Sequence, residues 1–206
     1  MHTPADADVV EPDADLDGLL LTGSLEGRDA SSAHLLECRL EGCDLTGLRA
    51  PRARLTDTVL YAVRGAGVDL ADTTWMDCTV EDARLGAVEL HGAELRRVRF
   101  TGGKVDYLNL RGATLRDVVF ENVVLTDLDL GDATLAGVTF EGCRLAGPDF
   151  TRARLTRVDL STAHLAAPRG LSGLAGATIS RLQLLDLAEA FALEAGVRVV
   201  DPTAPG

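Results

Sequence analysis

Large apolar residues recur at every fifth position along most of this 206-residue chain. Between residues 25 and 165, 26 of the 29 positions divisible by five hold Leu, Val, Phe or Trp. Neither the helical period of 3.6 nor the strand period of 2 produces this spacing. The residue two before each is typically small, as at Ala113, and the residue two after it is often a turn former, as at Gly112 and Asp117. The pattern predicts a five-residue unit with two inward side chains and a turn.

Such a unit cannot bury its apolar pair alone, so copies of it must stack on one another. Four units would close a square coil of 20 residues, and Phe100, Phe120 and Phe140 recur at that interval. Stacked coils place like residues over like, so the recurrence favours this coil length. Residues 25–165 then predict about seven coils, or about 34 Å of rod at roughly 4.8 Å per coil.

The N-terminus departs from the five-residue pattern. Residues 1–18 are acidic, contain Pro4 and Pro12, and hold no Lys or Arg. Such a composition is typical of disordered segments. We therefore expect a disordered acidic tail over residues 1–18 and a domain of stacked coils over residues 19–168.

The C-terminus, residues 169–206, is expected to form a cap with a helix near residues 180–195. Ser180 and Gln183 have capping-box spacing, and Gly196 is a typical helix stop. The helix carries more apolar side chains than one buried face needs. It either plugs the open end of the coils, or it also joins two copies across a two-fold axis. A short strand is expected over residues 197–200. The residues proposed for capping or dimerisation are Leu182, Leu185, Phe191 and Leu193.

The repeated unit resembles that of the pentapeptide-repeat proteins. It appears here as Ala93-Glu94-Leu95, as Ala113-Thr114-Leu115 and as Ala133-Thr134-Leu135-Ala136-Gly137. The resemblance implies an all-β fold, a right-handed quadrilateral parallel β-helix, here with a C-terminal capping α-helix. The ending, with a helix, a glycine and a short strand, is similar to the dimerising ending of the gyrase-binding members. Those members mimic B-DNA in the DNA-binding groove of DNA gyrase or topoisomerase IV, and they inhibit the enzyme or protect it from quinolones.

No motif in the sequence indicates catalysis. Each of the four cysteines stands two residues before a central apolar position, where a small buried hydrophobe explains it. There is no Cys-x-x-Cys pair, and Gly102-Gly103-Lys104 is followed by Val105 where a phosphate-binding loop would have Ser or Thr. We predict no enzymatic activity, no cofactor and no metal. The cysteines are Cys38, Cys43, Cys78 and Cys143.

The formal net charge is −12, from 32 acidic and 20 basic residues. Residues 1–24 contribute −6, and residues 25–165, with 22 acids and 17 bases, contribute −5. This balance disfavours direct nucleic-acid binding. No stretch approaches the roughly 20 apolar residues that span a bilayer, and the acidic start lacks the order of a secretory signal. A cytoplasmic protein is expected.

When outward residues are sorted by face, acids form columns on two opposite faces. A third face carries Arg64, Arg84, Lys104 and Arg144 in a column. The acids either make the rod a DNA mimic for gyrase or topoisomerase IV, or only keep a generic scaffold for another protein partner in solution. About 34 Å of duplex carries on the order of 20 phosphate charges, so mimicry has to depend on the columns and not on the net charge. The candidate interaction residues are Asp69, Glu81, Asp82, Glu89, Glu121, Asp129, Asp132, Glu141 and Asp149.

Overall fold

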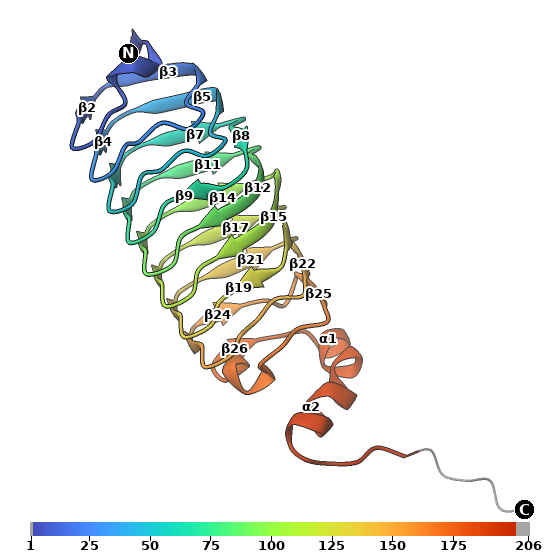
Figure 1. The fold of residues 1–206 in the computed structure, drawn as a ribbon. Coiled ribbons are helices and arrows are strands. Elements are labelled where there is room, and N and C mark those ends of the chain that lie inside the picture. The colour runs from blue at the N-terminus through green and yellow to red at the C-terminus, as the bar shows by residue number, and fades with distance from the viewer. Residues whose placement is uncertain (1, 201–206) are drawn as a thin grey trace, which may run out of the picture.

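The computed structural model describes residues 2–200; Met1, in the expected tail, and residues 201–206, in the expected cap, lie outside the described residues. The chain winds into a rod of stacked parallel strands with the two described ends at opposite ends of the rod (Figure 1). The predicted all-β parallel β-helix is confirmed. We name its four sides faces A, B, C and D, in the order in which the chain crosses them.

Face A is an eight-stranded parallel sheet. Its strands are β2 (Asp15–Asp17), β4 (His34–Leu36), β6 (Arg54–Thr56), β10 (Thr74–Met76), β13 (Glu94–Arg96), β16 (Thr114–Arg116), β20 (Thr134–Ala136) and β23 (Arg154–Thr156).

The other three faces belong to one 18-stranded sheet that wraps around the rod. Face B holds β1 (Thr3–Ala5), β3 (Leu19–Ser24), β5 (Arg39–Asp44), β7 (Val59–Tyr61), β11 (Thr79–Glu81), β14 (Arg99–Thr101), β17 (Val119–Glu121), β21 (Thr139–Glu141), β24 (Val158–Asp159) and β26 (Ala177–Thr178). Face C holds β8 (Arg64–Gly65), the first halves of β12 (Arg84–Glu89) and β15 (Lys104–Asn109), β18 (Val124–Thr126), β22 (Arg144–Ala146) and β25 (His164–Ala166). Face D holds β9 (Val68–Asp69), the second halves of β12 and β15, and β19 (Leu128–Asp129).

Residues 20 apart lie side by side on neighbouring coils, which confirms the predicted coil length. Phe100 pairs with Phe120, and Phe120 pairs with Phe140. Their rings stack with centroids 4.6 and 4.8 Å apart and are nearly parallel. The backbone spacing between strands thus equals a favourable ring spacing, so the hydrogen-bond ladder and the core packing reinforce each other.

The rod has about nine coils, where seven were predicted, because the N-terminus is part of it. The expected disordered tail instead forms β1, a 3-10 turn over Ala7–Val9 and β2, which pair with the coil that follows. Leu16 and Leu21 are both buried and stand five positions apart, but Leu25 follows only four positions after Leu21. A register shift between Thr22 and Ser24 absorbs the missing residue. Because this one spacing of four breaks the five-residue period, the pattern in the sequence did not include the first coil.

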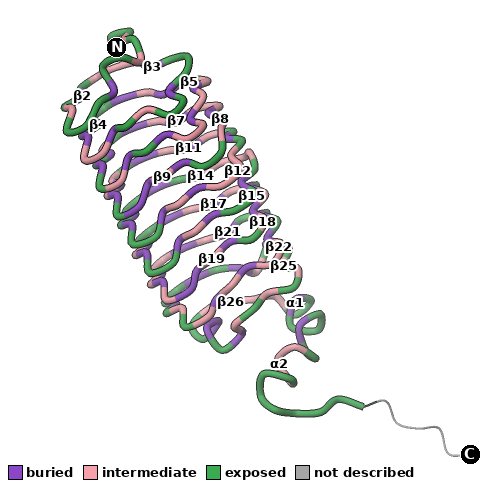
Figure 2. The backbone as a smooth tube through the Cα atoms, in the orientation of Figure 1, coloured by how far each residue is buried: buried purple, intermediate pink, exposed green. Residues whose placement is uncertain are grey.

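The central apolar residues form one continuous core along the rod (Figure 2). Leu95, Leu115 and Leu135 are all fully buried, as the spacing predicts. All four cysteines are buried free thiols, as expected. Burial raises the pKa of Cys78 to about 11, so this thiol stays protonated and unreactive near neutral pH.

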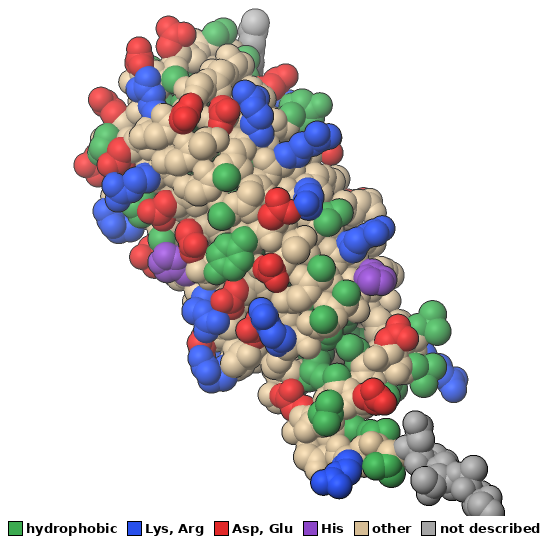
Figure 3. All heavy atoms as spheres, turned by 45° about the vertical axis from the view of Figure 1, so that its right-hand side comes forward, with side chains coloured by type: hydrophobic (Ala, Val, Ile, Leu, Met, Phe, Trp, Pro, Cys, Tyr) green, Lys and Arg blue, Asp and Glu red, His purple; other side chains and the backbone are tan. Residues whose placement is uncertain are grey.

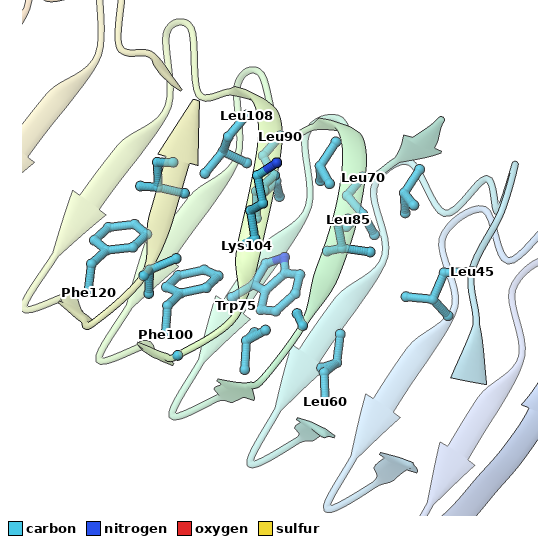
Figure 4. Close-up of a pocket in the computed structure, with 18 residues that line it drawn as sticks. Leu45, Leu60, Leu70, Trp75, Leu85, Leu90, Phe100, Lys104, Leu108 and Phe120 are labelled. Carbon is cyan, nitrogen blue, oxygen red and sulfur yellow. The ribbon is translucent and has the colours of Figure 1, made fainter. Parts of the chain in front are cut away.

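The central position at Gly65 has no side chain. An enclosed apolar cavity of about 40 Å³ lies beside Trp75, with Leu60, Leu85 and Phe100 in its lining (Figure 4). The Trp75 indole lines this cavity, and its N–H donates to Thr73 Oγ1 at 2.9 Å. A cavity of this size has room for about one water molecule and is a packing defect, not a ligand pocket.

The C-terminal end is closed by a 3-10 turn over Leu171–Leu174, by β26 and by two short helices, α1 (Arg181–Asp186) and α2 (Ala188–Glu194). The predicted capping box forms, because Gln183 N donates to Ser180 Oγ and Ser180 N donates to Gln183 Oε1. Gln183 also donates to the carbonyls of Leu160 and Ala163, which ties α1 to the last coil. The single expected helix is divided at Leu187. The strand expected over residues 197–200 is wrong, because these described residues form none.

Candidate functional site: the charged faces and the apolar end

Most of the candidate acids on face D form bonds with other groups of the rod. Asp129 Oδ1 accepts the backbone N–H of Gly131 at 2.8 Å, and Asp149 Oδ1 accepts that of Thr151 at 2.8 Å. Asp69 makes the same local bond to Ala71 N at 3.1 Å. In these three coils the Asp just before the central residue thereby holds the turn after it. These hydrogen bonds stabilise the folded rod, and they explain the column of acids on face D without a binding partner.

Arginines from neighbouring coils neutralise the same face. Arg111 pairs with Asp129 at 2.9 Å and with Asp132 at 3.4 Å, and Arg152 pairs with Asp132 at 2.6 Å. Arg169 lies 3.7 Å from Asp149.

Glu89, the remaining candidate on face D, accepts a hydrogen bond from Asn109 Nδ2 at 2.6 Å. On face D arginines therefore neutralise Asp129, Asp132 and Asp149, whereas Asp69 and Glu89 have no arginine partner in the described range of the chain.

Face B keeps more of its acids free. Glu121 is bonded by Arg99 at 3.2 Å, but Glu81, Asp82 and Glu141 have no ion-pair partner among residues 2–200. The register stacks Glu121 directly beside Glu141, and it separates Glu81 from Glu121 by Thr101. Of the nine candidate acids, four therefore have no ion-pair partner among residues 2–200, and three of these four, Glu81, Asp82 and Glu141, lie on face B, whereas Asp69 lies on face D.

Sequence reasoning missed the unpaired cations of face A. Arg54, Arg96, Arg116 and Arg154 are exposed, and none of them has an ion pair within the described part of the chain. Arg96 and Arg116 are neighbours in register. In the linear sequence each stands near acids such as Glu94 or Asp117, so the average charge concealed four arginines that share one face. Figure 3 shows acidic and basic side chains interleaved on the side in view.

The C-terminal end exposes apolar side chains. Leu182, Leu185 and Leu193 are 74%, 64% and 72% exposed, respectively. Phe191, the fourth residue proposed for this role, packs against the core and lines a hollow of about 500 Å³ together with Leu171. In Figure 3 the apolar side chains gather around this end of the rod. Exposed apolar clusters of this kind mark contact surfaces in soluble proteins.

No group of three or more His, Cys, Asp or Glu side chains within residues 2–200 is placed to hold a metal ion. None of the helices in that range has the length and apolarity needed to cross a bilayer.

Acid should weaken the rod. The hydrogen bond from Arg97 holds the pKa of Asp77 below its ordinary 3.8, and that from Arg152 does the same for Asp132. A carboxyl with a lower pKa in the folded state than in the unfolded state stabilises the fold above the unfolded pKa, and this contribution is lost as pH falls through the folded pKa. We expect the urea midpoint to fall as pH drops below about 4, at an ionic strength that screens long-range repulsion.

Circular dichroism at a series of pH values measures this effect. Asp132→Asn should flatten part of the pH dependence, because its side chain no longer titrates. A urea midpoint that stays constant or rises on acidification would contradict the prediction.

A family model described as pentapeptide repeats (8 copies) matches residues 106–142 and 125–161. No curated protein sequence matches the chain. Among solved structures, HetL, a pentapeptide repeat protein involved in heterocyst differentiation regulation from the cyanobacterium Nostoc sp. strain PCC 7120, is 21% identical with a TM-score of 0.42, over 82% of this chain and 90% of HetL. A trypsin-treated form of QnrB1, a plasmid-mediated fluoroquinolone resistance protein, is 18% identical with a TM-score of 0.41, over 96% of this chain and 95% of QnrB1. Likenesses this distant do not bear on what this chain binds.

Proposed function

We propose that this chain, whose residues 106–161 match the pentapeptide-repeat model, is a pentapeptide-repeat protein that serves as a non-catalytic protein-interaction module and acts as a homodimer. The observation that carries the proposal is the exposed apolar end. Each leucine that a contact covers there would contribute about 1.5–3 kcal/mol.

A second copy fits this end better than a client protein does. Leu182 and Leu185 belong to α1 and Leu193 belongs to α2, and both helices lie at the C-terminal end of the rod (Figure 1). A two-fold contact there would be self-complementary and would leave all four faces of both rods free for partners. At roughly 4.8 Å per coil, two rods of about nine coils would extend about 86 Å end to end.

The dimer is tested by light scattering after gel filtration. Wild type should run as a dimer, and the variant Leu182→Asp/Leu185→Asp/Leu193→Asp should run as a monomer with an unchanged circular dichroism spectrum. Leu36→Asp is the matched control, because Leu36 is also an exposed leucine but lies on face A. A monomeric wild type would disprove the dimer, and a triple variant that remains dimeric would disprove the apolar end as its interface.

The client that we propose is DNA gyrase or topoisomerase IV, bound by DNA mimicry through face B, with inhibition of the enzyme or protection from quinolones as the outcome. The unpaired carboxylates Glu81, Asp82 and Glu141 support face B over face D. An 86 Å pair of rods would match about 25 base pairs of duplex at 3.4 Å per pair. The basic outward side chains of face A, next to face B, would limit the docking to one side of the rod.

A supercoiling assay separates this client from others. Wild type should inhibit gyrase at low micromolar concentration, with an effect that weakens as salt rises. Glu81→Gln/Asp82→Asn/Glu141→Gln should inhibit at least about tenfold more weakly. Asp129→Asn/Asp132→Asn is the control and should change inhibition less than about twofold, because arginines already neutralise those acids. Absence of inhibition at low salt would remove gyrase as the client and leave the dimer untouched.

The alternative is a scaffold for a non-topoisomerase protein. The unpaired arginines of face A favour an acidic partner in that case. Replacing Arg96 and Arg116 by Gln should then abolish capture of the partner, whereas the face B variant should retain it.

A further inference from the structure

Face C carries a surface hollow of about 510 Å³ between two neighbouring coils. Strand β12 contributes Arg84, Leu85 and Gly86, and the adjacent coil contributes Gly103, Lys104 and Asp106. The hollow lies outside the acidic columns and away from the apolar end, so the proposed function does not use it.

Two cations, Arg84 and Lys104, line this hollow, and Arg64 on the preceding coil continues their row. The register places Arg64 beside Arg84, and Arg84 beside Lys104. Like charges directly opposite on neighbouring strands destabilise a sheet. The outer two are compensated, since Arg64 lies 3.5 Å from Asp44 and Lys104 lies 2.5 Å from Asp106. Arg84, in the middle, has no carboxylate within ion-pair distance among the described residues.

Two glycines create the space. A Cβ on Gly103 would lie 2.2 Å from the carbonyl oxygen of Ala83, and a Cβ on Gly86 would lie 2.8 Å from the Cβ of Ala66. Gly103 also has a φ of +74°, which favours glycine. Only glycine fits both positions, and the absence of side chains leaves the hollow beside the cations.

The repeat changes its geometry at the same two coils. At the corner between faces C and D, most coils turn on a left-handed residue, with φ of +67° at Gly67 and +48° at Asp127. β12 and β15 instead run unbroken through this corner. The opened corner, the two glycines and the uncompensated arginine therefore coincide at one place in the rod.

We propose that this hollow binds the phosphate chain of a small polyphosphate ligand. The Arg84 guanidinium donates two hydrogen bonds to one phosphate, and the Lys104 ammonium forms an ion pair with the next phosphate. Arg84 and Lys104 lie on adjacent strands, about 5 Å apart at the backbone, and Arg64 extends the row by one more strand spacing, so the cations suit two or more linked phosphates better than a single carboxylate. Asp106 competes for Lys104, so binding requires this ion pair to open.

Isothermal titration with inorganic tripolyphosphate, without magnesium and at low ionic strength, tests the site. Wild type should bind one ligand per chain, and Arg84→Gln/Lys104→Gln should bind at least about tenfold more weakly. Asp106→Asn should bind a few-fold more tightly, because its competing charge is gone. Arg154→Gln, an exposed cation of face A, is the control and should change affinity less than about twofold.

A parallel titration with ATP distinguishes two sources of the same phosphate chain. Tighter binding of ATP would assign the site to a nucleoside triphosphate, and equal binding would assign it to inorganic polyphosphate. No binding at millimolar ligand would overturn the proposal. An equal loss in Arg154→Gln and in the double variant would overturn it too, because it would mean non-specific attraction. Circular dichroism of each variant confirms that the rod is folded.

Discussion

Replacing Phe120 by alanine is expected to lower the free energy of unfolding by about 4 kcal/mol. Phe120 is fully buried and stacks between Phe100 and Phe140. The coils on either side cannot move in to fill the space, because backbone hydrogen bonds hold them at the strand spacing. The cavity would therefore persist, and both ring contacts would be lost.

Urea denaturation followed by far-ultraviolet circular dichroism measures this loss. Tyr107→Ala is the matched control, since Tyr107 is an aromatic residue that is 36% exposed on the surface, and it should change stability by about 0.5 kcal/mol or less. A loss below about 1 kcal/mol in Phe120→Ala would show that the coils relax around the deletion and that the stack does not hold the core together.

Replacing Gly173 by alanine is expected to open the turn that closes the rod. A Cβ at this position would lie 1.8 Å from the carbonyl oxygen of Phe150. The clash is with backbone in the last coils, so the turn over Leu171–Leu174 has to move away. Its buried leucines would then be exposed to water, at a cost of about 3 kcal/mol.

Hydrogen exchange of residues 171–195, together with thermal unfolding, measures this opening. Gly112→Ala is the control that tests the strain of a positive φ without a steric clash. Gly112 has a φ of +66°, and no neighbouring heavy atom lies within 4 Å of the added Cβ. That control should lose only about 1 kcal/mol. Unchanged exchange in Gly173→Ala would mean that the turn is not needed to close the rod.

Particular residues show how far the sequence could be read. Phe100, Phe120 and Phe140 set the coil at 20 residues, and the structure pairs them in that register. The sequence did not predict the first coil, because the spacing of four positions between Leu21 and Leu25 interrupts the five-residue period. At the other end, Ser180 and Gln183 predicted the helix start correctly, because a capping box involves only residues three apart.

The candidate acids were harder to judge. Asp132 looks free in the sequence, where the residues from 117 to 143 include no base. In the folded rod it lies between Arg111 and Arg152, from the coils on either side. The 20-residue register brings these chains near one another, but rotamer and reach decide which pairs form. Only the folded structure shows that the candidate acids Glu81, Asp82 and Glu141 of face B have no ion-pair partner among the described residues.

By itself the sequence determined the rod, the coil length and the buried side chains. Burial here depends on spacing along the chain, and a period of five admits one way of hiding so many leucines. Only the tertiary structure decided which charges remain available, where the repeat opens into a hollow, and that the N-terminus joins the rod. Those outcomes depend on contacts between coils, which form between residues far apart in the chain and are settled by side-chain reach and steric fit.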